Sequence, residues 1–298
     1  MASFASDDPV PGSLPRPEGE LTSEEPATAE EDDAFDGGDL YNLFVCEDYV
    51  VKTWQFGDLE MPLKCSNMST TQYDLTGQIV WPACVLLSWY IYAQRETFKD
   101  AVVLELGAGC GLSGFVAAKY CRHSTVTDGN EIVTSLLRQN KDFLSADNVT
   151  VEKLLWGIKS EVERSVASKD RTSSSSSSRY PDFIIGADVI LWPNMILPLL
   201  YTIRWLLAYK RGQSKCIISY VVRAHSTTKL LYTTASRMGL DVQSAAVENF
   251  LPLDCTDFNS LEKCLLIISI DPSVSELELQ RDVSSEIEEV NAVSAMPC

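Results

Sequence analysis

A short glycine-rich segment lies between an apolar stretch and a helical pattern. Within Val102–Leu112, Glu105 stands two residues before Gly107, and further glycines follow at Gly109 and Gly111. Alternating glycines remove the side chains that would keep a ligand away from the backbone. The first turn of the helix that follows presents unpaired N–H groups. The segment therefore has the chemistry of a cofactor-binding loop.

The spacing of these glycines distinguishes between kinds of cofactor. Dinucleotide sites use G-x-G-x-x-G to hold a pyrophosphate, whereas this loop is G-x-G-x-G with an acid before it. A carboxylate at Glu105 would repel a pyrophosphate but suits a cofactor with an amino acid end and a sulfonium cation. We predict that Glu105, Gly107, Ala108 and Gly109 bind such a cofactor. A nucleotide-phosphate site and a purely structural turn are the alternatives.

A second acid, Asp128, ends the next expected strand, twenty-three positions after Glu105. In a doubly wound sheet the ends of neighbouring strands meet in one crevice. A carboxylate there accepts hydrogen bonds from both hydroxyls of a ribose, so we predict that Asp128 binds the sugar of the cofactor. The alternative is that Asp128 only caps a helix that begins near Asn130.

The elements that must position these residues alternate between short apolar stretches and helical patterns, which is typical of a parallel sheet with helical crossovers and hence of an α/β fold. The expected strands are Ala101–Glu105, Ser124–Asp128, Val149–Lys153, Phe183–Asp188, Cys216–Val222, Asp241–Phe250 and Leu265–Ile270. The expected helices are Pro82–Gln94, Leu112–Cys121, Ile132–Phe143, Met195–Tyr209 and Thr228–Met238. The last two strands are close enough in sequence to form a hairpin.

The two ends of the chain differ from its middle in charge. Residues 1–39 hold twelve acids and one base, and residues 271–298 hold seven acids and one base, so most of the net charge of −18 lies there. We predict acidic disordered tails around one domain at 40–270. That domain is expected to begin with a small antiparallel β-ribbon at 40–66, and a flexible serine-rich insertion is expected at 160–179.

Composition argues against several classes of protein. The nearly neutral middle lacks the basic footprint of a nucleic-acid binder. The two histidines, His123 and His225, are far apart, so we expect neither a metal site nor a histidine-centred triad. The apolar run Ile79–Ala93 is short and contains Pro82, which favours a buried helix over a membrane span. Nine cysteines without a CxxC pair, and no secretory signal, predict a cytoplasmic or nuclear protein with reduced thiols. We expect a monomer.

Four segments together resemble a known family. They are the glycine loop, Gly77-Gln78-Ile79-Val80-Trp81, Leu154-Leu155-Trp156-Gly157 and Asp182-Phe183-Ile184-Ile185-Gly186-Ala187-Asp188. Over residues 40–270 the chain resembles methyltransferase-like family 16, the seven-β-strand methyltransferases that mostly modify lysine on non-histone proteins. The resemblance implies a Rossmann-like seven-stranded class I methyltransferase sheet and the methyl donor S-adenosylmethionine. It also implies cofactor contacts by Trp81, by Trp156 beside the adenine, and by Ala187.

The predicted catalytic residue is Asp188, at the carboxyl end of the fourth expected strand, where a carboxylate would orient the acceptor nitrogen or take its proton through water. Its alternative role is to cap a helix or hold the strand end. The family usually has D/E-x-x-Y/F at this point, but this chain has Leu191 in the aromatic position, followed by Trp192. The acceptor is therefore less certain than the cofactor. Tyr220 and Arg223 are expected on the same side of the sheet.

Two further functions stay open at this point. Trp81-Pro82 also resembles the branch of the family linked to arginine methylation, so lysine is favoured only modestly. Leu191 is compatible with a non-catalytic protein that binds S-adenosylmethionine, although the intact loop and Asp128 argue against it. A small-molecule or RNA methyltransferase is a third class, which the fold alone does not exclude.

Overall fold

In the computed structural model, residues 49–67, 73–167, 180–210, 213–252 and 262–275 are described. Seven of the described strands form one sheet in the order β5-β4-β3-β6-β7-β9-β8. The strands are β3 (Val102–Leu106), β4 (His123–Asp128), β5 (Val149–Lys153), β6 (Phe183–Ala187), β7 (Lys215–Val221), β8 (Leu240–Ala245) and β9 (Lys263–Ile270). All neighbours are parallel except β9, which is antiparallel to β7 and to β8. This is the predicted α/β sheet, and the predicted hairpin of the last two strands is confirmed.

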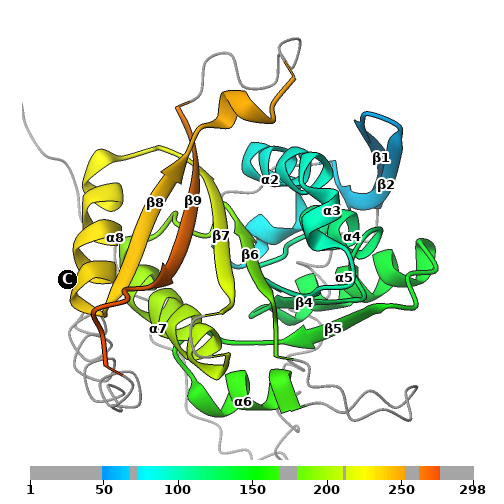
Figure 1. Ribbon diagram of the computed structural model, residues 1–298. Helices are drawn as coiled ribbons and strands as arrows, with labels where there is room; N and C mark the ends of the chain where they lie inside the picture. Colours follow the sequence, from blue (N-terminus) through cyan, green and yellow to red (C-terminus); the bar gives the residue numbers. More distant parts are fainter. Residues whose placement is uncertain (1–48, 68–72, 168–179, 211–212, 253–261, 276–298) are drawn as a thin grey trace, which may run out of the picture. The chain divides into compact units, whose positions relative to one another are not determined.

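Side chains of the buried strands alternate between the two faces of the sheet, as the period of two requires. Ile185 packs into the hydrophobic cluster on one face and Ile184 into the cluster on the other. Helices cover both faces (Figure 1). The first face carries α2 (Pro82–Ala93), α4 (Leu112–Ala118) and α5 (Glu131–Phe143); the second carries α6 (Lys159–Ala167), α7 (Pro193–Tyr209) and α8 (His225–Arg237). The apolar run at Ile79–Ala93 thus contributes the predicted buried helix, α2.

The order of the strands fixes where a ligand can bind. From β3 the chain crosses to β4 on one side, and it later returns to β6 on the other side of β3. Loops that leave β3 and β6 therefore diverge, and the crevice between them lies beyond the carboxyl ends of the strands. Glu105 stands just before the end of β3, Asp128 at the end of β4 and Asp188 just after the end of β6.

A two-stranded antiparallel ribbon precedes the sheet, as predicted: β1 (Tyr49–Phe56) and β2 (Leu59–Ser66). The ribbon is attached to α5 through Asn140. The side chain of Asn140 accepts a hydrogen bond from the N–H of Lys64 at 2.8 Å and donates to the carbonyls of Lys64 and Cys110, each at 3.0 Å. The ribbon and the end of the glycine loop are thereby attached to the same helix.

The stretch 160–179 differs from the prediction in its first half, where it forms α6 instead of a flexible insertion. Val162 and Val166, one helical turn apart, are buried in the second hydrophobic cluster. Residues 168–179, which include the serine run, lie outside the described part of the chain. So do 1–48, which contain the predicted acidic tail and the first part of the ribbon, and 276–298.

Two other boundaries shift. The strand expected over Asp241–Phe250 ends at Ala245 and is followed by the 3-10 turn η2 (Val247–Asn249). The predicted acidic tail begins with ordered residues, because the N–H of Asp271 donates to the carbonyl of Gly239 at 2.9 Å. Other short elements are η1 (Tyr73–Gln78) and α3 (Arg95–Phe98). Among the described helices, none has the length and apolar composition that crossing a bilayer requires.

Candidate active site

A cavity of about 300 Å³ opens where the carboxyl ends of the strands diverge, a size that lies in the range of small-molecule sites. It collects almost all of the residues that the sequence predicts for cofactor and acceptor. These are Trp81, Gly107, Ala108, Gly109, Asp128, Trp156, Ala187 and Asp188, with Leu191 and Trp192. The predicted residue that does not line it is Glu105.

The glycine loop forms one wall of this cavity in a conformation that favours glycine. Gly107, Gly109 and Gly111 have φ angles of +61°, +55° and +87°, a left-handed region that costs other residues free energy. A Cβ on Gly107 would lie 2.9 Å from Val189 and 3.0 Å from the indole of Trp156, and one on Gly109 would lie 3.0 Å from a backbone oxygen. The loop therefore needs glycine both for its backbone angles and for the space around it.

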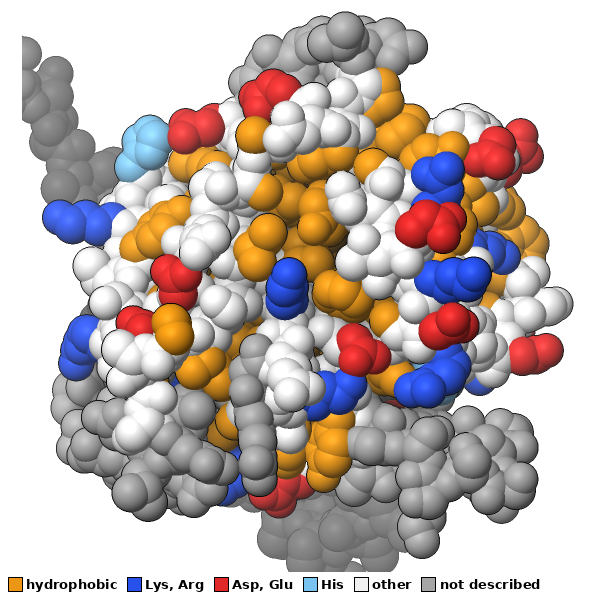
Figure 2. Space-filling model, viewed as in Figure 1, with side chains coloured by type: hydrophobic (Ala, Val, Ile, Leu, Met, Phe, Trp, Pro, Cys, Tyr) orange, Lys and Arg blue, Asp and Glu red, His pale blue; other side chains and the backbone are white. Residues whose placement is uncertain are grey.

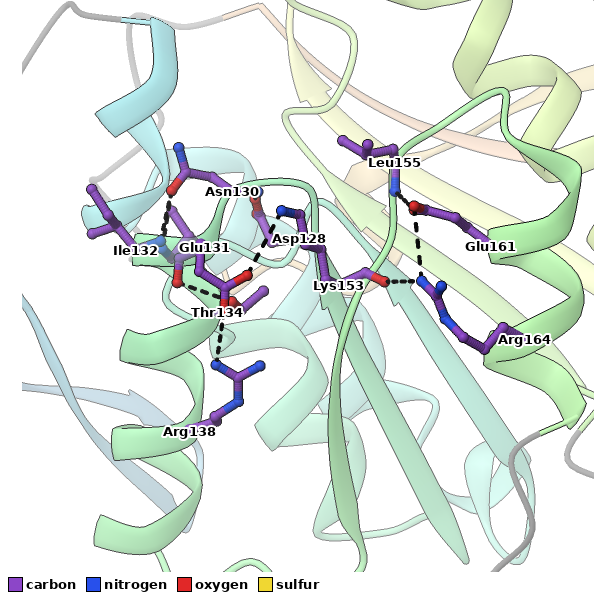
Figure 3. Close-up of polar contacts among 11 residues, drawn as sticks. Asp128, Asn130, Glu131, Ile132, Thr134, Arg138, Lys153, Leu155, Glu161 and Arg164 are labelled. Atoms are coloured by element: carbon purple, nitrogen blue, oxygen red, sulfur yellow. Dashed lines mark hydrogen bonds and ion pairs between the residues drawn. The ribbon is translucent and has the colours of Figure 1, made fainter. Parts of the chain in front are cut away.

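Asp128 lies in the cavity wall with its carboxylate already oriented by the backbone. Its oxygens accept hydrogen bonds from the N–H groups of Gly109, at 3.2 Å, and Asn130, at 3.0 Å. Burial raises the pKa of this carboxyl, and the backbone donors partly oppose that effect. The cap of α5 is instead Asn130, whose side chain accepts from the N–H groups of Ile132 and Val133 (Figure 3). The side chain of Asp128 is thus not the cap of α5, and its carboxylate in the cavity wall can accept hydrogen bonds from hydroxyl groups of a ligand.

Glu105 has a different place from the one predicted. Its side chain is 1% exposed and accepts a hydrogen bond from the N–H of Gly114 in α4 at 2.9 Å. Burial raises its pKa to about 8, which the nearby hydrogen bonds oppose only in part. Because Glu105 precedes the end of β3 and points toward α4, its carboxylate lies behind the glycine loop. Its role in this structure is to hold the loop and the helix together, so direct contact with a cofactor is not supported.

The two tryptophans form fixed walls. The Nε1–H of Trp81 donates to the carbonyl of Thr76 at 2.9 Å, just before α2. Trp156 belongs to a loop after β5 whose backbone is held at the residue before it and at the residue after it. The N–H of Leu155 donates to Glu161 of α6 at 2.6 Å, as Figure 3 shows, and the N–H of Gly157 donates to Thr202 at 2.9 Å. Such fixed indoles offer a ligand a large apolar surface.

The acceptor end of the cavity is built around an ion pair. Arg223, just beyond β7, donates from Nη1 to Oδ1 of Asp188 at 2.7 Å and from Nη2 to Oδ2 at 2.6 Å. Its guanidinium carbon lies 5.3 Å from the centre of the Trp81 ring. Asp188 has a φ of +58°, and its N–H donates to the carbonyl of Ser219. This residue is thus held by both its backbone and its side chain.

The charged side chains near the rim occur as mixed pairs. Glu131 contacts Arg138 and Lys153 at 3.3 and 3.7 Å, and Glu161 contacts Arg164 at 3.8 Å. Figure 3 shows these contacts around the loop that follows β5. On the face shown in Figure 2, basic and acidic side chains alternate without a continuous basic stripe. A stripe of that kind is what a protein needs to follow a phosphate backbone.

A family model described as lysine methyltransferase matches residues 63–236, which is more than half of the chain. The chain belongs to this lysine methyltransferase family. The resemblance inferred from the sequence is therefore confirmed, and the order of the strands agrees with the class I methyltransferase sheet that the family predicts.

Individual relatives cover a smaller part. The human protein-lysine N-methyltransferase EEF2KMT is 29% identical over 184 residues, 56% of this chain and 52% of the relative. The Xenopus tropicalis protein N-lysine methyltransferase METTL21A is 34% identical over 42% of this chain and 52% of its own. The mouse histone-arginine methyltransferase METTL23 is 31% identical over 44% of this chain and 48% of its own. The chain thus spans about half the length of the curated relatives that it matches.

Several lining residues were not predicted from the sequence. Gly77 and Ile79 come from the segment that the lysine methyltransferase resemblance includes, although only Trp81 was assigned there. Asn130 lies two residues after Asp128 and was noticed only as the start of a helix. Cys84 and Met195 lie in helices and carry no local signal of a site. Arg223 was expected near the cavity, but its pairing with Asp188 was not.

Proposed function

We propose that the protein transfers a methyl group from S-adenosylmethionine to a lysine side chain of another protein. The observation that carries the proposal is the cavity itself, in which the glycine loop and Asp128 form one end and Asp188 the other. Membership of the lysine methyltransferase family and the two protein-lysine methyltransferase relatives support the choice of acceptor.

The residues present fit S-adenosylmethionine. Asp128 supplies an oriented carboxylate for two ribose hydroxyls. Gly107 and Gly109 leave the backbone of the loop accessible, since a Cβ on Gly107 would press on Trp156. Trp156 supplies the flat apolar wall that an adenine needs. The carboxylate of Glu105 is excluded from this set, so the amino acid end of the cofactor must bind to other groups, chiefly the backbone of the loop and of the segment around Gly77.

When bound, this cofactor supplies a sulfonium-activated methyl group. In the transfer, the acceptor nitrogen forms a bond to the methyl carbon while the carbon–sulfur bond breaks and its electron pair stays on sulfur. The chain has no strong chemistry to supply and acts mainly by alignment. Trp81 and Ala187 line the cavity. Apolar surroundings of this kind favour the uncharged form of an amine. The proton that lysine loses goes to solvent.

Arginine is the second acceptor that a specific observation supports. The METTL23 relative is a histone-arginine methyltransferase, and Trp81-Pro82 at the start of α2 resembles that branch. A guanidinium acceptor keeps its charge through the reaction and needs carboxylates to hold it. The carboxylate at the acceptor end, Asp188, is already paired with Arg223, which favours lysine.

The proposal is tested by labelling and by calorimetry. Purified protein is incubated with tritiated S-adenosylmethionine and heat-treated cell extract, and labelled bands are compared with those made by Asp128→Ala. We expect a protein band that depends on Asp128 and yields methyl-lysine on hydrolysis. Calorimetry with S-adenosylhomocysteine measures the cofactor site separately. Binding without a labelled band would favour a non-catalytic protein, and absence of binding would remove the proposal entirely.

A protein acceptor, a monomeric state and a cytoplasmic or nuclear location belong to the same proposal. The location is supported by the six described cysteines, which are free thiols and fit a reducing compartment.

A further inference from the structure

The acceptor end of the cavity holds a cation that belongs to the chain itself. The guanidinium of Arg223 makes two short hydrogen bonds to both oxygens of Asp188 and lies over the ring of Trp81. Trp81 and Asp188 both line the large cavity. Arg223 lines a small adjoining cavity, which shares Leu191 with the large one. The guanidinium therefore stands at the acceptor side of the site, between these two spaces.

The pair is fixed rather than loose. The Asp188 side chain is 5% exposed, and the N–H of Val221 also reaches Oδ1, at 3.4 Å. Arg223 donates from Nη1 to the carbonyl of Val221 at 3.2 Å as well. A buried carboxylate that loses its only cation is strongly disfavoured, so the guanidinium does not leave without a replacement. Both carboxylate oxygens of Asp188 are thus engaged by the guanidinium in this arrangement.

The features that usually hold a cationic acceptor are taken or missing. The π face of Trp81 and the carboxylate of Asp188 would both attract a cation, and Arg223 occupies both. Trp192 lines the same cavity. Leu191 stands where an aromatic ring is expected, and it offers no cation–π contact. A charged acceptor would meet the guanidinium and, in the complex, a sulfonium, and the described carboxylate nearest to the guanidinium, Asp188, is already paired.

Building on the proposed function, we propose that Arg223 is a specificity-determining residue that admits an uncharged amine to the transfer point and excludes a guanidinium. A lysine can enter as its neutral amine, which is also the form with a free electron pair. An arginine side chain stays charged at every relevant pH and is repelled. The cationic neighbour lowers the pKa of the entering amine, as like charges do, so that more of it is reactive near pH 7.

Other titratable groups near Arg223 are few among the described residues. Besides Asp188 they are Cys84 of α2, Tyr220 of β7, and the surface pair of His225 and Glu262, 3.8 Å apart. Burial raises the pKa of the Cys84 thiol and raises that of Tyr220 to about 12. Both therefore stay neutral between pH 6.5 and 9.5. His225 is 83% exposed, so solvent screens its interaction with Arg223.

The test is the pH dependence of labelling. Tritiated S-adenosylmethionine and heat-treated cell extract are incubated with wild type, Arg223→Gln and Arg223→Lys from pH 6.5 to 9.5, and the initial rate of the same band is followed. We expect Arg223→Gln to move the midpoint upward by about one pH unit, roughly a tenfold loss near pH 7 that disappears at high pH. Arg223→Lys keeps the charge and should keep the wild-type midpoint.

Arg223→Gln leaves Asp188 unpaired and is the variant at risk of misfolding. The double variant Asp188→Asn/Arg223→Gln removes both charges and should show a smaller upward shift, because the unpaired carboxylate that also raises the pKa of the amine in Arg223→Gln is gone. An equal loss at every pH would assign Arg223 a purely structural role. A gain at pH 7 would mean that Arg223 blocks a site made for cations, and methyl-arginine in the wild-type hydrolysate would also overturn the proposal. A wild type that labels no band contradicts the proposed function instead, and it is seen before any variant is compared.

Discussion

The two ends of the cavity are built by different means. At the cofactor end, one short loop and the end of one strand supply the surface, and Asp128 is oriented only by backbone N–H groups. At the acceptor end, Asp188 is oriented by a side chain from 35 residues away. The first arrangement is local and leaves the carboxylate free for a ligand. In the second arrangement, both oxygens of the carboxylate are bonded to Arg223. The role of an acid in a site therefore depends on the partner that it already has.

The largest effect is expected at the cofactor end. Asp128→Ala removes the acceptor for two ribose hydroxyls and leaves the N–H groups of Gly109 and Asn130 without it. At about 1.5–3 kcal/mol for each hydrogen bond to a charged group, affinity for S-adenosylhomocysteine should fall at least 100-fold in calorimetry. Asp147→Ala, an exposed acid before β5, is the matched control and should bind normally. Equal binding by both variants would contradict the ribose role.

At the acceptor end, Asp188→Asn should affect transfer and spare the cofactor. The change breaks the ion pair with Arg223, so the guanidinium loses its fixed position beside the transfer point. We expect labelling to fall by up to about 100-fold, the loss that a misplacement of about 1 Å can cause. The dissociation constant of S-adenosylhomocysteine should stay within about twofold. Loss of cofactor binding in this variant would erase the distinction between the two ends.

Gly109→Ala tests whether the loop needs its backbone geometry. The φ of +55° and a Cβ 3.0 Å from the carbonyl oxygen of Gly77 predict a cost of about 1–3 kcal/mol, measured as a lower midpoint in urea. Gly129→Ala lies in the same cavity wall without a positive φ, and its Cβ would lie 3.1 Å from a methyl group of Leu155 and at an ordinary contact distance of 3.7 Å from the backbone oxygen of Leu154. It should be nearly neutral. Similar midpoints for both variants would mean that the loop adjusts freely.

Glu105→Gln tests the buried carboxyl group that lies behind the glycine loop. Because burial raises the pKa of Glu105 to about 8 in the folded protein, the folded state binds the proton more tightly than the unfolded state. Its contribution to stability is therefore fully present below about pH 4.5 and is lost as pH rises to about 8. Thermal unfolding should show this decline in wild type and a flatter profile in Glu105→Gln. Glu131→Gln, an exposed carboxylate, should keep the wild-type slope.

What the sequence predicted well was local. The glycine loop joins β3 to α4, and Asp128 ends β4, the strand that follows and pairs with β3. Spacing along the chain was therefore enough to predict that they lie close together. Glu105 was predicted to face the cofactor because it is close to the loop in sequence. Side chains alternate along β3, and this alternation directs Glu105 toward α4. The helix α6 was missed because the neighbouring serine run dominated the composition, although Val162 and Val166 already had helical spacing.

What the sequence did not predict was long-range. No pattern near Asp188 indicates that Arg223 will reach it, because the pairing depends on how β6 and β7 end in space. The departure at Leu191 was visible in the sequence, but its meaning was not. Arg223 already contacts Trp81 and Asp188. An apolar residue at position 191 agrees with the proposal that this end of the cavity takes an uncharged acceptor.

The buried amide of Asn140 couples β2, 76 residues before it in the chain, to the end of the glycine loop, 30 residues before it. One side chain serves both Lys64 of β2 and the carbonyl of Cys110 in the glycine loop, so order in the one is thermodynamically linked to order in the other. Occupancy of the cavity should then be detectable at a distance: hydrogen exchange at the Lys64 amide should slow when S-adenosylhomocysteine binds. The ribbon would thus act as a reporter of the state of the loop.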